Sequence, residues 1–261
     1  MTDSPSEASS EQAPQTPAPH PNFFVRQWRG WIKQILIVVI IVTAARSMIA
    51  DWNDVPSGSM LPSIQIGDRI VVNKLAYDVR VPFTTWRIAR WSQPSRGDVI
   101  TFWDPTSGIR MVKRAIGVPG DTIQIADGKL SITDAQGQPV SVTYQQQTAA
   151  LPRFVTLKDR QGRAHRSAIF DVQENIDGRA HDIQFTEQRP IKRNYGPVTL
   201  GPDEFWAMGD NRDNSRDSRF FRDDDHAIVN AKDITGHAFA VAWSLDESWI
   251  PRWNRFFKAL N

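Results

Sequence analysis

Three short segments of the chain hold residues that could do chemistry, and the first is Pro56–Pro62. In it Ser57 and Ser59 flank a glycine between two prolines. The prolines stiffen the backbone on both sides, and the glycine lets it take a tight conformation. In such a turn, one serine hydroxyl and nearby backbone amides could lie around a single oxygen atom. A serine hydroxyl is a weak nucleophile unless a base lies beside it. Judged by its composition alone, the segment is more typical of an ordinary linker.

The second segment is the strand expected over 110–116, which carries Lys113. Alternation along a strand places Lys113 on one face with Met111 and Ala115, and Arg114 on the other face. A lysine among apolar neighbours loses hydration, which lowers its pKa and lets the neutral amine act as a base. A lysine that extends its ammonium group to water from an edge strand would show the same pattern.

The third segment, 209–219, reads Gly-Asp-Asn-Arg-Asp-Asn-Ser-Arg-Asp-Ser-Arg. Acids and arginines follow one another so densely that a self-paired, buried polar network is expected. A calcium loop is the alternative, but the central glycine and final glutamate of the EF-hand pattern are missing. The 5 histidines show no metal-ligand spacing, and nothing marks which of them would serve a Ser-His-Asp triad.

Short strands must position these segments, because turn signals and apolar runs alternate from Val55 onward. Strands are expected over 69–74, 99–103, 110–116, 122–125, 130–133, 204–208 and 235–243. Val118–Asp121 predicts a type II turn, and Asp127-Gly128 predicts a hairpin. Residues 140–195 are polar with weak strand signals, so a less regular inserted β subdomain is expected there. The catalytic β domain would then comprise 53–139 and 196–261.

The N-terminal part differs from this β-rich body. Residues 1–22 are rich in proline and lack lysine and arginine, so a disordered tail is expected. A basic collar and the apolar run 35–45 follow, and that run is shorter than the roughly 20 residues that span a bilayer. A buried core helix and a cleaved signal peptide therefore compete with a membrane anchor over 23–52. The anchor is preferred, because the run has no polar face and tryptophans flank it.

Composition excludes several classes of function. The 261 residues carry a formal net charge of +2, which argues against a protein held to nucleic acid by bulk charge. With 0 Cys, disulfides, thiolate zinc sites and cysteine nucleophiles are excluded. Aromatic residues are frequent within 82–91 and near the C-terminus. We expect them to contact membrane lipid, with ordinary core packing as the alternative.

Together and in this order, the three segments resemble bacterial type I signal peptidases, also called leader peptidases. The resemblance rests on Pro-Ser-Gly-Ser-Met-x-Pro, Lys-Arg-Ala-x-Gly-x-Pro-Gly-Asp and Gly-Asp-Asn-Arg-Asp-Asn-Ser-x-Asp-Ser-Arg, and it covers about Trp31 to Leu245. It implies a mainly β protease body behind a single N-terminal transmembrane helix. It also implies a bacterial inner-membrane location, with the N-terminus cytoplasmic and the body on the periplasmic or extracytoplasmic side. The implied activity is removal of signal peptides from secretory preproteins after a small-x-small motif, typically Ala-x-Ala.

The same resemblance implies roles for individual residues. Ser59 would be the nucleophile and Lys113 the general base, and the Ser59 amide and Ser57 hydroxyl would form the oxyanion hole. Ser215 would orient the lysine through a hydrogen bond. The supporting residues would be Gly209, Asp210, Arg114, Asp217 and Arg219. The shallow substrate pockets are expected to involve Met60, Met111 and Val112. No metal or organic cofactor is expected.

Two other functions stay open. A self-cleaving repressor could use the same Ser/Lys chemistry, but no helix-turn-helix precedes the β region. A membrane-tethered, non-catalytic β domain that binds a secreted partner is the alternative from a different class. The chain also departs from the family pattern after Arg219, where Phe220-Phe221 leads to Arg222 and three aspartates instead of a glycine. This departure concerns the turn that follows Arg219 and not the pair of Ser59 and Lys113, which we call the dyad.

Overall fold

The computed structural model describes residues 23–81, 84, 86–104, 107–146, 153–158, 164–187, 193–220 and 228–260. The tail expected over 1–22 and the departure after Phe220 lie outside these residues. Two compact units are present, Met1–Thr43 and Ala44–Asn261, and each is described by itself.

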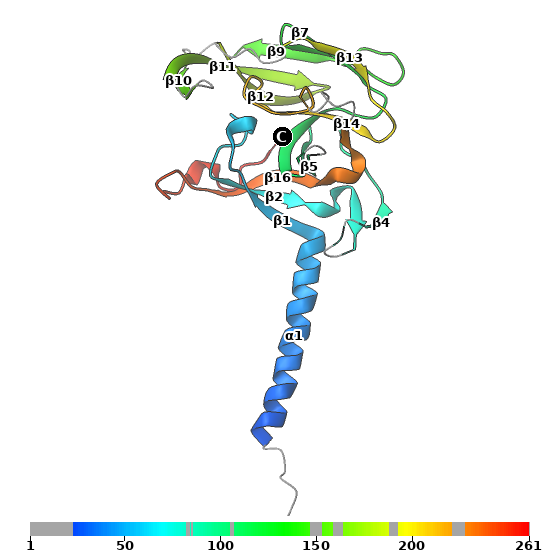
Figure 1. Ribbon diagram of the computed structural model, residues 1–261, viewed down its shortest axis with the longest axis vertical. Helices are drawn as coiled ribbons and strands as arrows, with labels where there is room; N and C mark the ends of the chain where they lie inside the picture. Colours follow the sequence, from blue (N-terminus) through cyan, green and yellow to red (C-terminus); the bar gives the residue numbers. More distant parts are fainter. Residues whose placement is uncertain are drawn as a thin grey trace, which may run out of the picture. The chain divides into compact units, whose positions relative to one another are not determined.

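The N-terminal helix α1 comprises Phe23–Ile49 (Figure 1). The apolar side chains from Ile35 to Val42 are exposed on it. Within the described part of the chain, no helix is long and apolar enough to cross a membrane. The segment expected over 23–52 also ends differently, because the chain leaves the helix at Ile49 and continues as strand β1, Ala50–Asp54. There the backbone pairs with β2, Asp68–Asn73, and these hydrogen bonds end the helix.

An antiparallel sheet of 7 strands, in the order β1-β2-β16-β5-β6-β14-β15, forms the main layer of the body (Figure 1). Its further strands are β5 Val99–Trp103, β6 Arg110–Gly117, β14 Glu204–Met208, β15 Val229–Asn230 and β16 Ile234–Ser244. The strands expected over 99–103 and 204–208 are confirmed to the residue. The other expected strands of this sheet shift by one residue at their ends.

A second sheet of 3 strands has the order β13-β7-β8. Its strands are β7 Thr122–Ala126, β8 Lys129–Thr133 and β13 Tyr195–Thr199. The predicted hairpin is confirmed, because Asp127 and Gly128 both adopt positive φ, 48° and 79°. The predicted turn before β7 is confirmed as well, with the Asp121 amide donating to the Val118 carbonyl at 3.0 Å and Gly120 at a φ of 88°.

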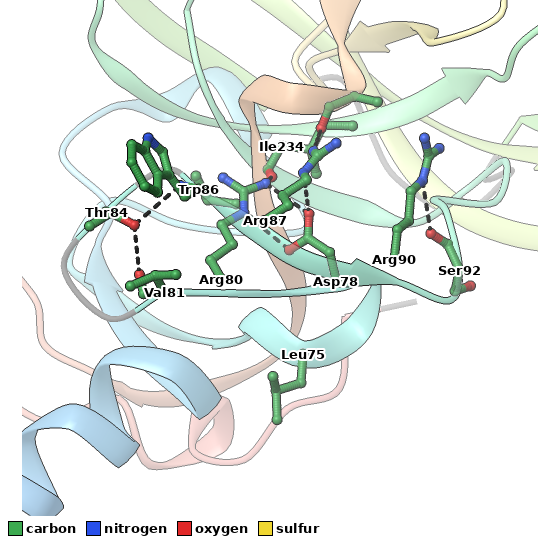
Figure 2. A network of polar contacts seen from close by, with 12 residues as sticks. Leu75, Asp78, Arg80, Val81, Thr84, Trp86, Arg87, Arg90, Ser92 and Ile234 are labelled. Atoms are coloured by element: carbon green, nitrogen blue, oxygen red, sulfur yellow. Dashed lines mark hydrogen bonds and ion pairs between the residues drawn. The ribbon is translucent and has the colours of Figure 1, made fainter.

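A small hairpin, β3 Asp78–Arg80 with β4 Arg87–Arg90, lies beside the main sheet. The buried Asp78 carboxylate pairs with both Arg80 and Arg87 (Figure 2). These two guanidinium groups also donate to the carbonyls of Ile234 and Ala231. The arginines of this hairpin therefore bind it to the end of the main sheet.

Within the insert, 4 described strands form a sheet that is more regular than the polar sequence predicted. Its strands are β9 Val142–Gln146, β10 Arg153–Lys158, β11 Ala164–Ile176 and β12 Arg179–Thr186. We call it the inserted sheet. The signal was weak because polar side chains such as Glu174, Gln184 and Thr186 occupy buried positions in it. Glu174, for example, pairs with the distant Arg212, which the local pattern does not reveal.

After α1, the described helical segments are single 3-10 turns. They are η1 Gly58–Met60, η2 Lys74–Ala76, η4 Ala231–Asp233 and η5 Trp253–Arg255. Buried side chains form three clusters around the sheets. One of them contains Met60, Val72 and Val241 and ties turn η1 to the main sheet. The predominance of strands agrees with the expected mainly β body.

Candidate active site

Ser59 lies in the middle of η1, the turn between β1 and β2. Its side chain is largely buried, and the next residue, Met60, is 1% exposed in the core. Burial of Met60 anchors the turn, while the Leu61 amide closes it with a hydrogen bond of 3.2 Å to the Gly58 carbonyl. The local sequence thus presents the serine hydroxyl from a short turn that is attached to the core.

Lys113 comes from β6, where it lies opposite Ile100 of β5. Its Nζ atom lies 2.7 Å from the Oγ atom of Ser59 and 2.9 Å from the carbonyl oxygen of Val112. The lysine side chain is 2% exposed. A nucleophile and a base at this distance are within direct proton-transfer reach.

Burial lowers the pKa of Lys113 to about 8, because a charged ammonium group loses hydration inside the protein. The carboxylates of Asp217, Asp210 and Asp104 oppose this effect only as charges at a distance. The neutral amine is therefore accessible near neutral pH. Desolvation of Lys113, expected from its apolar neighbours in the strand, is confirmed.

Arg114 follows Lys113 in the same strand, where alternation places the two side chains on opposite faces. Its guanidinium group donates to both carboxylate oxygens of Asp210, at 2.9 and 2.8 Å, and to the carbonyl of Gly97 at 2.7 Å. Both members of this ion pair are 1% exposed. A buried charge is tolerated only when it is paired and hydrogen-bonded, and the two-pronged geometry meets that condition.

A second buried ion pair joins Asp217 to Arg219, with two bonds of 2.8 Å. Asp217 also accepts a hydrogen bond of 3.1 Å from the Gly209 amide. A Cβ atom on Gly209 would lie 2.2 Å from the Ser215 Oγ and 2.4 Å from the Ser59 carbonyl oxygen. Glycine is required there because the serine turn and the 209–219 loop approach each other so closely.

The family model for signal peptidases of the peptidase S26 family matches residues 28–243. The chain belongs to this family. Signal peptidase I of Pseudomonas aeruginosa is 32% identical over 232 residues, which cover 85% of this chain and 76% of that protein. Signal peptidase I of Buchnera aphidicola from Acyrthosiphon pisum is 30% identical over 254 residues, covering 87% and 77%. Membership makes the protein a peptidase that removes signal peptides.

A solved structure of a signal peptidase I from Enterococcus faecalis is also similar. It shares 24% sequence identity, and the match covers 56% of this chain and 97% of that chain with a TM-score of 0.31.

Besides Ser59, the resemblance to signal peptidases implied two further serines in the site, Ser57 and Ser215. Ser57 is exposed, and its Oγ atom lies 3.5 Å from the Oγ atom of Ser59. Ser215 is buried beside Gly209, and the expected bond between its hydroxyl and Lys113 is not formed. The short contacts of the lysine amine are to Ser59 and to the Val112 carbonyl.

The three residues expected at the substrate pockets are divided between two core clusters. Met60 and Val112 pack in one core cluster. Met111 packs against a different cluster, which contains Ile100 and Phe102. Their part in substrate binding stays a prediction.

Sequence reasoning missed two features near the dyad. Asn211 contacts the carbonyls of the serine turn directly, although it lies within the recognised 209–219 motif. The buried Glu174 of β11 pairs with Arg212 of the same motif. A signal for Glu174 existed, because alternation puts it between Val172 and Ile176 on one face, as it puts Lys113 between apolar neighbours.

Proposed function

We propose that the protein is a serine endopeptidase that works through a Ser59/Lys113 dyad. The observation that carries this proposal is the distance of 2.7 Å between the lysine Nζ and the serine Oγ in a buried pair. The lowered pKa of Lys113, about 8, supports a lysine that is neutral in about a tenth of the molecules at pH 7 and in half of them at pH 8. No metal or organic cofactor enters the proposed chemistry.

In the first half of the reaction, neutral Lys113 accepts the hydroxyl proton of Ser59 as Oγ attacks the scissile carbonyl carbon. The tetrahedral intermediate carries its negative charge on the former carbonyl oxygen. When the C–N bond breaks, the ammonium group of Lys113 returns the proton to the leaving amine, and an acyl-enzyme remains. Water then attacks the ester with the lysine again as base, which releases the signal peptide and restores the serine.

The oxyanion needs donors at the position where the charge develops. We assign this role to the Ser59 amide and the Ser57 hydroxyl, which belong to the turn that carries the nucleophile. Gly209, Asp210, Arg114, Asp217 and Arg219 act as support, because their contacts hold β6 and the 209–219 loop beside the dyad.

The proposed substrate is a secretory preprotein cleaved after a small-x-small motif, typically Ala-x-Ala. The peptide binds extended, and short side chains before the scissile bond fit shallow pockets near the dyad. Met60, Met111 and Val112 remain the proposed pocket residues. We propose no nucleic-acid partner, because a formal net charge of +2 supplies little bulk attraction for phosphate groups.

Cleavage of a purified preprotein with an Ala-x-Ala site tests the dyad. Ser59→Ala and Lys113→Ala should each lower kcat/KM by about 1000-fold or more, since each removes a reacting group. Ser131 and Lys129 are exposed on β8. The single variants Ser131→Ala and Lys129→Ala are therefore matched controls, and each should cleave the preprotein at the wild-type rate. The rate should rise with pH through about 8, as the lysine loses its proton.

Three outcomes would contradict parts of this proposal. Cleavage that survives either dyad substitution excludes the mechanism. A wild-type chain that binds the preprotein without cutting it favours the alternative of a non-catalytic β domain that binds a secreted partner. Equal cleavage of a site with bulky residues in place of both alanines contradicts the proposed specificity.

We further propose that α1 attaches the chain to the bacterial cytoplasmic membrane, with the N-terminus in the cytoplasm and the body on the periplasmic or extracytoplasmic side. Support comes from the exposed apolar residues between Ile35 and Val42, with Trp28 and Trp31 exposed before them. In the body, exposed aromatic side chains gather in the two expected segments, namely Trp86, Trp91, Trp249, Trp253 and Phe257. Tryptophan favours the boundary between lipid and water.

Single-cysteine labelling tests this topology, because the chain has 0 Cys of its own. Ser131→Cys in intact cells with a permeable outer membrane should react with a maleimide that cannot cross the inner membrane. Protection of this site until the cells are lysed would contradict the proposed orientation. Recovery of the whole chain in the soluble fraction would contradict attachment.

A further inference from the structure

Asn211 contacts the turn of the nucleophile twice. Its backbone amide donates to the Ser59 carbonyl at 3.1 Å, and its side-chain Nδ2 donates to the Gly58 carbonyl at 2.9 Å. Two hydrogen bonds from one residue to successive carbonyls fix both the position and the tilt of a short turn. The direction of the Ser59 hydroxyl depends on that tilt.

Asn211 is in turn held by the inserted sheet. The Gln184 amide of β12 donates to the Asp210 carbonyl at 2.8 Å, and the Arg212 amide donates to the Gln184 carbonyl at 2.9 Å. Asn211 is thereby paired in parallel with Gln184, as a short extension of the sheet. The Thr186 amide adds a bond of 2.9 Å to the Asp213 carboxylate.

A buried charge cluster holds this junction. The Glu174 carboxylate of β11 is 0% exposed and binds both Nη atoms of Arg212, one of them at 2.9 Å. It also lies 3.0 Å from the Nε2 atom of His181 on β12. Burial by itself raises the pKa of Glu174, but Arg212 and His181 outweigh it and hold the pKa below its usual range. The carboxylate is therefore ionised at every working pH of the enzyme.

A buried ion pair is weak support for stability, because apolar residues of the same size often serve as well. Its effect here is geometric, since Arg212 directly follows the residue that contacts the serine turn. The two sheets reach the dyad through different residues, because β6 carries Lys113 and β12 holds Asn211.

We propose that Asn211 is a positioning residue for Ser59, and that the inserted sheet sets its position through the Glu174–Arg212 ion pair. This inference rests on the proposed function of Ser59 as the nucleophile. It gives the inserted sheet a role in catalysis: it aligns the nucleophile with the base on the main sheet.

A double-mutant cycle on the full chain tests the inference. Asn211→Ala should lower kcat by about 10- to 100-fold with little change in KM, because a small misplacement of a reacting group costs about that much. The pH at which the rate is half-maximal should stay unchanged, since Asn211 does not contact Lys113. Glu174→Gln should lower kcat similarly. The double variant should lose no more than Asn211→Ala alone, because both changes act through the same contact.

Asp78→Asn is the matched control. It removes a buried carboxylate that also holds arginines, but in the β3–β4 hairpin, where its partners are Arg80 and Arg87 (Figure 2). It should lower the denaturation temperature and leave kcat as in the wild type. If Glu174→Gln does not fold, a variant that carries both Glu174→Leu and Arg212→Met takes its place in the cycle. This variant removes both buried charges together, so neither is left unpaired.

The result that overturns the inference is an unchanged kcat in Asn211→Ala, or losses that multiply in the double variant. A loss of kcat in Asp78→Asn equal to that in Glu174→Gln would reduce the effect to general stability. Failure of the dyad itself has a separate signature, namely cleavage by Ser59→Ala.

Discussion

Lys113 and Arg114 are neighbours on β6, both almost fully buried, at 2% and 1% exposed, and yet their electrostatic states differ. Arg114 binds the Asp210 carboxylate with two hydrogen bonds. The lysine amine contacts a hydroxyl and a carbonyl instead, and its pKa falls to about 8. Burial alone therefore does not decide the charge of a side chain; the partner it meets does.

The chemistry of the two side chains suits this division. A guanidinium group stays charged in proteins and its planar fork matches a carboxylate, whereas a lysine amine readily loses its proton when buried. One strand thus supplies a permanent charge for support on one face and a titratable base on the other. Each of the following experiments changes one side of this comparison.

The largest effect is expected from Lys113→Arg. The substitution keeps a positive charge at the position but removes the neutral amine, because arginine does not deprotonate in proteins. We expect kcat/KM for the preprotein to fall by about 1000-fold or more, as for loss of a catalytic base. A single-turnover assay is the measurement. Substantial activity at any pH up to 10 would show that a neutral base at this position is not required.

A smaller effect, on stability, is expected from Asp210→Asn on the other face. It leaves the Arg114 charge buried without a carboxylate, which destabilises a protein by about 3–5 kcal/mol. Urea denaturation measures this. The control is Asp54→Asn, which breaks an exposed pair with Arg69 and should cost less than about 1 kcal/mol. Equal losses in the two variants would remove the distinction between buried and exposed pairs.

The smallest effect concerns the cost of burying the lysine. With a folded pKa of about 8 and an ordinary value of 10.5, both states carry the charge below pH 8, so the full cost is present there. Lys113→Met should therefore stabilise the protein by up to about 3 kcal/mol at pH 7. Between pH 8 and 10.5 the folded wild type loses its proton first, so its stability rises and the difference shrinks. A difference that is constant from pH 7 to 10.5 would contradict a depressed pKa.

Local features of the fold followed from the sequence wherever the signal was local. The strand over 99–103, the turn closed by Asp121 and the hairpin at Asp127-Gly128 each depend on a few adjacent residues. The inserted sheet was underestimated because its buried side chains are polar. Alternation places Glu174 on an apolar strand face, but only the folded chain shows the distant partner, Arg212, that makes its burial possible.

The site shows the same division. Alternation in the strand over 110–116 indicated the apolar surroundings of Lys113 and the opposite direction of Arg114, and the resemblance to signal peptidases indicated the dyad. The bond expected between Ser215 and the lysine is not formed. The contact of Asn211 with the serine turn had no local signal, because it depends on how two loops approach.

By itself, the sequence determined the family, the reactive residue types and the face on which each lies. The tertiary structure decided the charge on these residues and their alignment. Ser59 and Lys113 are 54 positions apart in the chain, and Arg114 and Asp210 are 96 apart. Desolvation and ion pairing depend on every group within a few ångströms, and only the folded chain brings such distant residues to that distance.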